Sequence, residues 1–357
     1  MSANKTPAAL GYRMPAEWEP HTATWLSWPR REGISFPDSF DRVLPTLREM
    51  VGALTESESV CINVVNGAHE AEARAVLDRL PHQECITYYE IPTNEPWCRD
   101  HGPIFLTRAA RPKPATGRIR GGELAIVDWD YNAWGNKYPP FDLDEVVPTR
   151  VAELLRVPVF YPKMILEGGS IEVNGAGTLL TSESCLLNKN RNPNLSRDEV
   201  EKRLRDFLGV TEILWLGDGI EGDDTDGHID DLARFVSETK VVTVVEENSD
   251  DANFKPLQEN LERLRGMKVG GRKVDIVRLP MPKKIIREEM RLPASYANFY
   301  IANTVVLVPT FADPADKVAL SILKDCFPKR RVVGIDCREL IWGLGTFHCL
   351  TQQQPAV

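Results

Sequence analysis

The chain has 357 residues, of which 42% are hydrophobic and 27% charged, a composition typical of a globular protein with a large core. Its formal net charge of −9 argues against non-specific nucleic-acid binding, which needs a basic surface, and suits a small cationic partner. No stretch approaches the length of a membrane span, and the N-terminal sequence MSANKTPAAL lacks the apolar region of a signal peptide, so we expect a cytoplasmic protein.

Apolar runs of strand length alternate with amphipathic stretches of helical length. In chain order, the pattern predicts a helix over 40–54, a strand over 60–65, a helix over 69–80, a strand over 124–129, a helix over 196–208, a strand over 241–245, a helix over 254–265 and a strand over 305–308. Such alternation predicts an α/β chain. No low-complexity linker divides the chain, so we expect one domain over residues 1–357. The nearest candidate for a linker is the basic, Pro- and Gly-rich segment 108–122, which we interpret as a surface loop within that domain.

Polar segments precede several of the apolar strands and recur along the sequence. Taking Asp100, Glu167, His228, Tyr296 and Cys349 as their markers, the spacing is roughly 60 to 70 residues, with a shorter last step. A repeat of this length predicts a radial or stacked architecture in which equivalent loops meet at one site.

The cysteines and histidines provide candidates for nucleophilic catalysis. Seven cysteines without a C-x-x-C pair are typical of free thiols in a reducing compartment. Cys349 would need a partner that moves protons, and among six histidines His228 stands out, because an extended strand would place it on one face with Asp230. His348 adjoins Cys349, but neighbours on a strand point to opposite faces. A lone cysteine is more often a small buried apolar residue, so the interpretation depends on these features occurring together.

Three carboxylates accompany Cys349 and His228 in the marked segments, namely Asp100, Glu167 and Asp230. Such a set suits a cation. A guanidinium group offers paired N–H donors to carboxylates, and its charge favours a neighbouring thiolate. A metal ion is the competing cation, since these side chains could also hold zinc or iron. No two of them have the spacing of a dedicated metal motif, so we expect no metal.

Four motifs together resemble one family, as does the N-terminal segment MPAEWEPHTATWLSWP. The motifs are EPWCRDHGP (95–103), LEGGSIEVNGAGTLLTSESCLLNKNRNP (166–193), EGDDTDGHIDDLARF (221–235) and GTFHCLTQQQP (345–355). They resemble the agmatine deiminases, in the bacterial peptidylarginine-deiminase-like branch of the guanidine-modifying superfamily. The resemblance runs from about residue 14 to 355 and implies a five-bladed α/β propeller, or pentein, of ββαβ repeats around a central channel. In that fold the last strand would deliver Cys349 into the channel.

The resemblance also implies roles for the marked residues. Cys349 would attack the guanidinium carbon, and His228 would act as general acid and base. Asp100 and Asp230 would bind the guanidinium nitrogens, while Glu167 would orient His228. No metal or organic cofactor would be required.

Substrate choice is less constrained by the motifs. Trp97 is expected to form a wall of the substrate site, and Asp224 in the acidic segment is our candidate for binding a distal amine. We expect hydrolysis of agmatine to N-carbamoylputrescine and ammonia through a covalent thiouronium, as a step of putrescine biosynthesis. The alternatives are a deiminase of peptidyl or free arginine that forms citrulline, an amidinotransferase, and a non-catalytic binding propeller. By resemblance, a homodimer would be unsurprising.

Overall fold

The computed structural model describes residues 5–109 and 122–357, so that the expected surface loop lies almost wholly outside the described residues. In this part of the chain, five sheets share one pattern. Two antiparallel strands are followed, after at least one helix, by a strand parallel to the second. A parallel connection needs a crossover, which the helix supplies. The mixed α/β class is therefore confirmed, and the repeated ββαβ unit is consistent with the expected propeller.

Four of these units follow one another along the chain. The first contains β4 (Ile104–Arg108), β5 (Glu123–Val127), α4 (Ala133–Asn136), α5 (Asp142–Glu145), α6 (Val147–Leu155) and β6 (Val159–Phe160). The second contains β7 (Ile171–Val173), β8 (Thr178–Ser182), α7 (Glu183–Leu186), α8 (Arg197–Leu208) and β9 (Glu212–Leu216). The third contains β10 (Ala233–Phe235), β11 (Lys240–Val245), α9 (Phe254–Gly266), the hairpin β12 (Lys268–Val269) and β13 (Arg272–Lys273), and β14 (Asp275–Pro280). The fourth contains β17 (Tyr300–Ile301), β18 (Val305–Thr310), α10 (Ala315–Cys326) and β19 (Arg331–Asp336), after the hairpin β15 (Ile285–Arg287) and β16 (Met290–Leu292).

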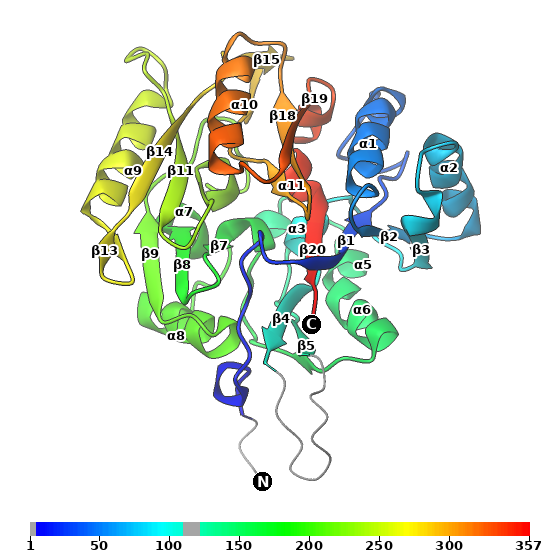
Figure 1. The fold of residues 1–357 in the computed structure, drawn as a ribbon, viewed down its shortest axis with the longest axis horizontal. Helices are drawn as coiled ribbons and strands as arrows, with labels where there is room; N and C mark the ends of the chain where they lie inside the picture. The colour runs from blue at the N-terminus through cyan, green and yellow to red at the C-terminus, as the bar shows by residue number, and fades with distance from the viewer. Residues whose placement is uncertain (1–4, 110–121) are drawn as a thin grey trace.

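The fifth unit joins the two ends of the chain. Its elements are β20 (Thr351–Pro355), β1 (His21–Ser27), α1 (Phe40–Leu54), β2 (Ser59–Val64), α2 (Gly67–Leu77) and β3 (Ile86–Glu90). Strand β20 pairs antiparallel with β1, with Thr24 opposite Gln353. Figure 1 shows this pair near the middle of the ribbon, beside the short helices α3 (Cys98–His101) and α11 (Phe347–Leu350), while the longer helices lie towards the outside. The pairing fixes the C-terminal segment at the centre of the fold.

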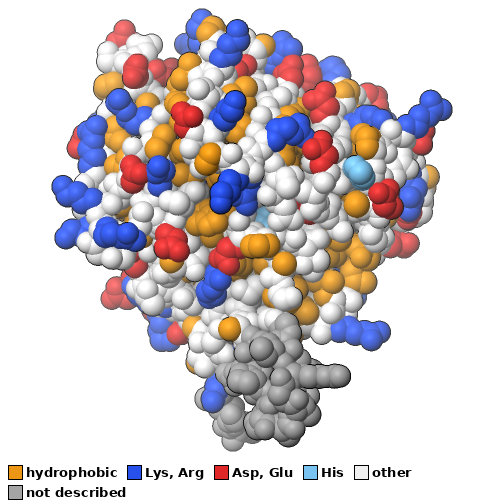
Figure 2. Space-filling model, viewed as in Figure 1, with side chains coloured by type: hydrophobic (Ala, Val, Ile, Leu, Met, Phe, Trp, Pro, Cys, Tyr) orange, Lys and Arg blue, Asp and Glu red, His pale blue; other side chains and the backbone are white. Residues whose placement is uncertain are grey.

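Local sequence signals explain where the helices begin and end. Helix α8 begins at a capping box formed by Ser196 and Glu199, and ends before Gly209, whose φ of 71° is a left-handed conformation that favours glycine. Helix α2 begins two residues before the predicted start because the Asn66 side chain caps its first turn. None of the described helices has the length and apolar character needed to cross a bilayer. Basic and acidic side chains are interspersed on the face shown in Figure 2, without a broad basic patch there.

Candidate active site

The marked residues occupy equivalent places in the repeated units, each just before the first strand. Asp100 lies in α3 before β4, Glu167 before β7, His228 and Asp230 before β10, and Cys349 in α11 before β20. The spacing in the sequence therefore reflects one loop per unit. Two expectations about backbone geometry were wrong. His228 and Asp230 lie at a 3-10 turn (Ile229–Asp231), and Cys349 lies in a short helix rather than in the last strand.

Because His348 lies in the short helix α11 and not on a strand, its side chain points in a different direction from the one expected. Successive side chains of a helix are about 100° apart, so residues 348 and 349 do not point to opposite faces as they would on a strand. Both reach Asp230, with Nδ1 of His348 at 2.6 Å and Sγ of Cys349 at 3.8 Å from its Oδ2. His348 therefore belongs to the site, contrary to the expectation from the sequence.

A cavity of about 200 Å³ leads to Cys349. Asp100 and Asp224 also line it, together with the aromatic side chains Trp97, Trp134, Tyr138 and Trp342. The Trp97 indole donates from Nε1 to Oγ of Ser35 at 2.8 Å. A Cβ added to Gly343 or Gly345 would lie 2.8 or 2.7 Å from the Trp97 ring, so these glycines allow the final segment to pass close to the cavity wall.

Two buried carboxylates, Asp100 in the cavity lining and Asp230 beside Cys349, form no ion pair with Lys or Arg within the described residues. Asp100 accepts hydrogen bonds from Nε1 of Trp134 and from the backbone N–H of Gly169, each at 2.9 Å. Burial raises the pKa of Asp100 to about 7, with a further contribution from Glu167. Burial and the nearby Asp100 raise the pKa of Asp230 well above its usual range. Both shifts mean that the empty site opposes negative charge, and that a bound cation would stabilise the two carboxylates.

Cys349 is held by Asn298, which donates from Nδ2 to Sγ at 3.1 Å. Burial, followed by the carboxylates Asp230, Asp231 and Asp100, raises the pKa of the Cys349 thiol well above its usual value. The thiol is therefore protonated in the empty site, and a cation beside it would favour the thiolate.

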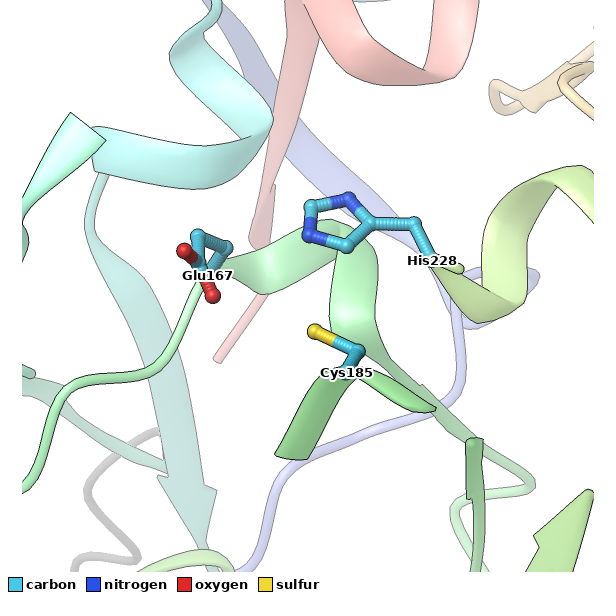
Figure 3. Close-up of side chains that lie close together, drawn as sticks. All are labelled: Glu167, Cys185 and His228. Atoms are coloured by element: carbon cyan, nitrogen blue, oxygen red, sulfur yellow. The ribbon is translucent and has the colours of Figure 1, made fainter. Parts of the chain in front are cut away.

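Figure 3 shows Glu167 and Cys185 close to the His228 ring, with ligand atoms of the three residues within 4.8 Å of one another. Oε1 of Glu167 accepts from Nε of Arg191 at 2.6 Å. Oε2 of Glu167 and both ring nitrogens of His228 make no hydrogen bond with any described residue, so Glu167 lies near the His228 ring without a direct bond to it. Burial and the Arg191 charge lower the pKa of His228, which is therefore neutral. Arg191 also disfavours a second cation on Glu167.

The structure brings together all five residues expected to be catalytic and places Trp97 and Asp224 in the wall of the cavity. Sequence reasoning missed Asn298, because Tyr296 served as the marker of its segment. The Tyr296 hydroxyl instead donates to Asp316 at 2.7 Å. Asn298 precedes β17 as Asp100 precedes β4, so aligning the loops on the strand starts would have found it. Trp134 lies in no motif that the sequence analysis singled out.

Comparison with known proteins gives a consistent result. The profile of the Porphyromonas-type peptidyl-arginine deiminases matches residues 13–355. A putative agmatine deiminase of Legionella pneumophila is 35% identical over 99% of this chain and 98% of its own, and the agmatine deiminase of Medicago truncatula is 35% identical with both chains covered in full. The solved agmatine deiminase of Enterococcus faecalis has a TM-score of 0.90 at 32% identity, covering 99% of this chain and 98% of its own. A substrate-bound agmatine deiminase of C. jejuni has a TM-score of 0.86 at 30% identity, covering 96% of each chain.

Proposed function

The chain belongs to the family of Porphyromonas-type peptidyl-arginine deiminases, and from this premise we propose that it is an agmatine deiminase, which hydrolyses agmatine to N-carbamoylputrescine and ammonia. One observation carries the proposal. The carboxylates of Asp100 and Asp230 lie beside the Cys349 thiol, are buried, and form no ion pair with a described Lys or Arg. A guanidinium group supplies the missing positive charge and places its carbon next to the sulfur.

The first half of the reaction forms a covalent intermediate. The carboxylates of Asp100 and Asp230 accept hydrogen bonds from the guanidinium nitrogens, and the bound charge favours loss of the Cys349 proton. The thiolate attacks the guanidinium carbon, and a tetrahedral carbon forms. Neutral His228 receives the thiol proton and delivers it to the leaving nitrogen as the C–N bond breaks. Ammonia departs, and a thiouronium remains on Cys349.

The second half replaces sulfur by oxygen. His228 accepts a proton from water, and the resulting hydroxide attacks the thiouronium carbon. The C–S bond then breaks and its electron pair leaves with the sulfur, while the added hydroxyl loses its proton and the ureido product departs. One of the two protons restores the Cys349 thiol, and the other leaves His228 and converts the released ammonia to ammonium. A carboxylate oxygen of Glu167 lies within 4.8 Å of a ring nitrogen of His228, and this carboxylate stabilises the imidazolium that forms in each half. Every step uses only protein side chains and water.

Features of the cavity favour agmatine over arginine. Asp224 lines the same cavity as Cys349, and its carboxylate accepts a hydrogen bond from the Tyr138 hydroxyl. A carboxylate in this wall suits the distal ammonium of agmatine. Free arginine carries an α-carboxylate as well, yet the described lining residues include no Lys or Arg that would neutralise it. The cavity therefore supports a substrate with a cationic group at each end.

Ammonia release tests the proposal, with agmatine, free arginine and a blocked arginyl peptide compared side by side. The expected result is a strong preference for agmatine and complete loss of turnover in Cys349→Ser. Cys326→Ser is the matched control, because this half-buried thiol lies at the end of α10, outside the cavity lining. Equal or better kcat/KM for arginine would contradict the proposed substrate. Turnover of none of the three would favour the non-catalytic alternative.

A further inference from the structure

His348 lies between two carboxylates at the centre of the fold. Its Nδ1 is 2.6 Å from Oδ2 of Asp230, and its Nε2 is 2.9 Å from Oε2 of Glu17. All three side chains are buried. Glu17 comes from the N-terminal segment, Asp230 from the loop before β10, and His348 from α11, so the arrangement depends on three distant parts of the chain. Neither His348 nor Glu17 takes part in the reaction steps described above.

The geometry fixes the number of protons that the three groups hold. Ionised carboxylates only accept hydrogen bonds, and a neutral imidazole carries one N–H. Two hydrogen bonds from one ring to two carboxyl groups therefore need two hydrogens. The second hydrogen resides either on the other ring nitrogen or on one of the carboxyl groups. The Glu17–His348–Asp230 group thus contains one proton more than a neutral histidine with two carboxylates.

Neighbouring charges decide where that proton rests. Oε2 of Glu17 lies 2.9 Å from Nη2 of Arg234 and 3.3 Å from Nη2 of Arg99. Although burial alone would raise the pKa of Glu17, these two cations hold it below its usual range. Glu17 therefore stays ionised and accepts from Nε2 of His348. The remaining choice is between Asp230 and Nδ1 of His348.

The occupancy of the cavity shifts this choice. In the empty site, burial and the carboxylates of Asp100 and Asp223 raise the pKa of Asp230, and they outweigh the opposite effect of Arg234 and Arg99. Burial together with the same two arginines lowers the pKa of His348. Arg234 also forms an ion pair with the carboxylate of Glu172, with 2.7 Å between Nε of Arg234 and Oε2 of Glu172. The extra proton then rests on Asp230. A guanidinium beside Asp230 reverses the preference, because a cation stabilises the carboxylate and not the carboxylic acid.

We propose that His348 is a positioning residue that takes the proton of Asp230 when a guanidinium group binds, and returns it when the site empties. In this step the O–H bond of Asp230 breaks, its electron pair stays on the carboxylate, and an N–H bond forms at Nδ1 of His348. The proton moves within an existing hydrogen bond, so this pair releases none to solvent. The inference rests on the proposed function in that the bound cation is a guanidinium.

Proton counting provides the first test. Agmatine binding to Cys349→Ser is measured by calorimetry in two buffers of different ionisation enthalpy, with and without His348→Asn. We expect the double variant to release about one proton more than the single variant, because asparagine cannot store the proton that Asp230 loses. Any proton that Asp100 releases on binding is released equally by the two variants, so it cancels in the comparison. Equal proton release would overturn the inference, since a purely structural role of His348 would change affinity but not proton count.

A second test leaves the ring intact and does not depend on folding of the double variant. Nitrogen NMR of histidine-labelled Cys349→Ser should report a neutral His348 in the empty protein and a doubly protonated ring with agmatine, or with millimolar guanidinium chloride. A neutral ring in the complex would overturn the inference even if the wild-type enzyme turned over agmatine. Protonation by guanidinium without agmatine turnover would contradict the proposed function and retain the inference. Failure of both probes to bind would contradict both.

Discussion

Asn298 holds the sulfur of Cys349 from another repeat unit, donating from Nδ2 to Sγ at 3.1 Å across 51 residues of sequence. Two further hydrogen bonds fix this amide. Its Oδ1 accepts from Oγ1 of Thr346 at 2.8 Å, and Nδ2 also donates to Asp231 at 3.1 Å. The amide orientation is thereby set so that a donor faces the sulfur, which favours the thiolate once the substrate is bound.

Replacement of Asn298 by alanine should lower kcat about tenfold to a hundredfold, because a hydrogen bond to a charged group contributes about 1.5–3 kcal/mol. Alkylation of Cys349 by iodoacetamide should slow at each pH as the thiol pKa rises. Asn174→Ala is the control, since its side chain donates to the backbone of Glu238 in a turn away from the cavity. Unchanged kcat and alkylation rates would show that Asn298 does not support the nucleophile.

The site residues that could be predicted from the sequence lie in loops that occur once in every ββαβ unit. The residues that were missed are those whose place in the site depends on packing between units. Cys349, His228, Glu167 and Asp100 each precede a strand, and the family motifs mark these loops. The contact between His348 and Asp230 joins residues 118 positions apart in the sequence and depends on the short helix α11. A helix of four residues is too short to show an apolar periodicity, so it was not predicted. The four predicted helices, over 40–54, 69–80, 196–208 and 254–265, correspond to α1, α2, α8 and α9, because apolar spacing and capping are local, whereas α6 and α10 were not predicted.

Trp134→Phe should raise the KM for agmatine about tenfold with a smaller effect on kcat. The substitution removes the Nε1 donor to Asp100 and leaves the aromatic wall, so the Asp100 pKa rises and less of the carboxylate is available to the substrate. Trp129→Phe is a matched control, because the buried Nε1 of Trp129 has no hydrogen-bond partner among the described residues. Steady-state kinetics of both variants would decide, and equal KM values would contradict the role of this donor.

Substrate binding should weaken below neutral pH. The pKa of Asp100 in the empty site is about 7, above its usual 3.8, so the group is protonated at lower pH and must lose its proton to bind a cation. The association constant of agmatine for Cys349→Ser should therefore fall about tenfold per pH unit below pH 7 and level off above about pH 8. Calorimetry between pH 5.5 and 8.5 measures this. Asp100→Asn should bind weakly at every pH, and a retained slope in that variant would assign the titration to another group.

Asp224→Asn should raise the KM for agmatine about tenfold and leave that for butylguanidine, which lacks the distal ammonium, nearly unchanged. The reason is that the lost charge acts only on the far end of the substrate, across a partly desolvated cavity. Asp250→Asn, at an exposed position, is the control for a general loss of negative charge. A parallel rise of KM for both substrates would place the effect of Asp224 on the structure of the site instead.

Gly169→Ala should abolish most activity while the protein remains folded. The backbone N–H of Gly169 donates to Asp100, and a Cβ on this residue would lie 2.5 Å from Nδ1 of His228, 2.8 Å from Oδ1 of Asp100 and 3.0 Å from Oδ2 of Asp230. Three groups of the proposed reaction would have to separate by up to about 1 Å, and a displacement of that size costs about a hundredfold in rate.

The control for this substitution is Gly266→Ala at the end of α9, where an added Cβ meets no atom within 4 Å. The melting temperature and kcat/KM of both variants are compared with the wild type. We expect Gly169→Ala to lose at least about a hundredfold in kcat/KM, and Gly266→Ala to stay within about twofold. The backbone of Gly169 does not need the left-handed region, so the loss would arise from crowding of the three polar groups and not from backbone strain. Activity of Gly169→Ala close to the wild type would mean that catalysis does not need His228, Asp100 and Asp230 to converge at this point.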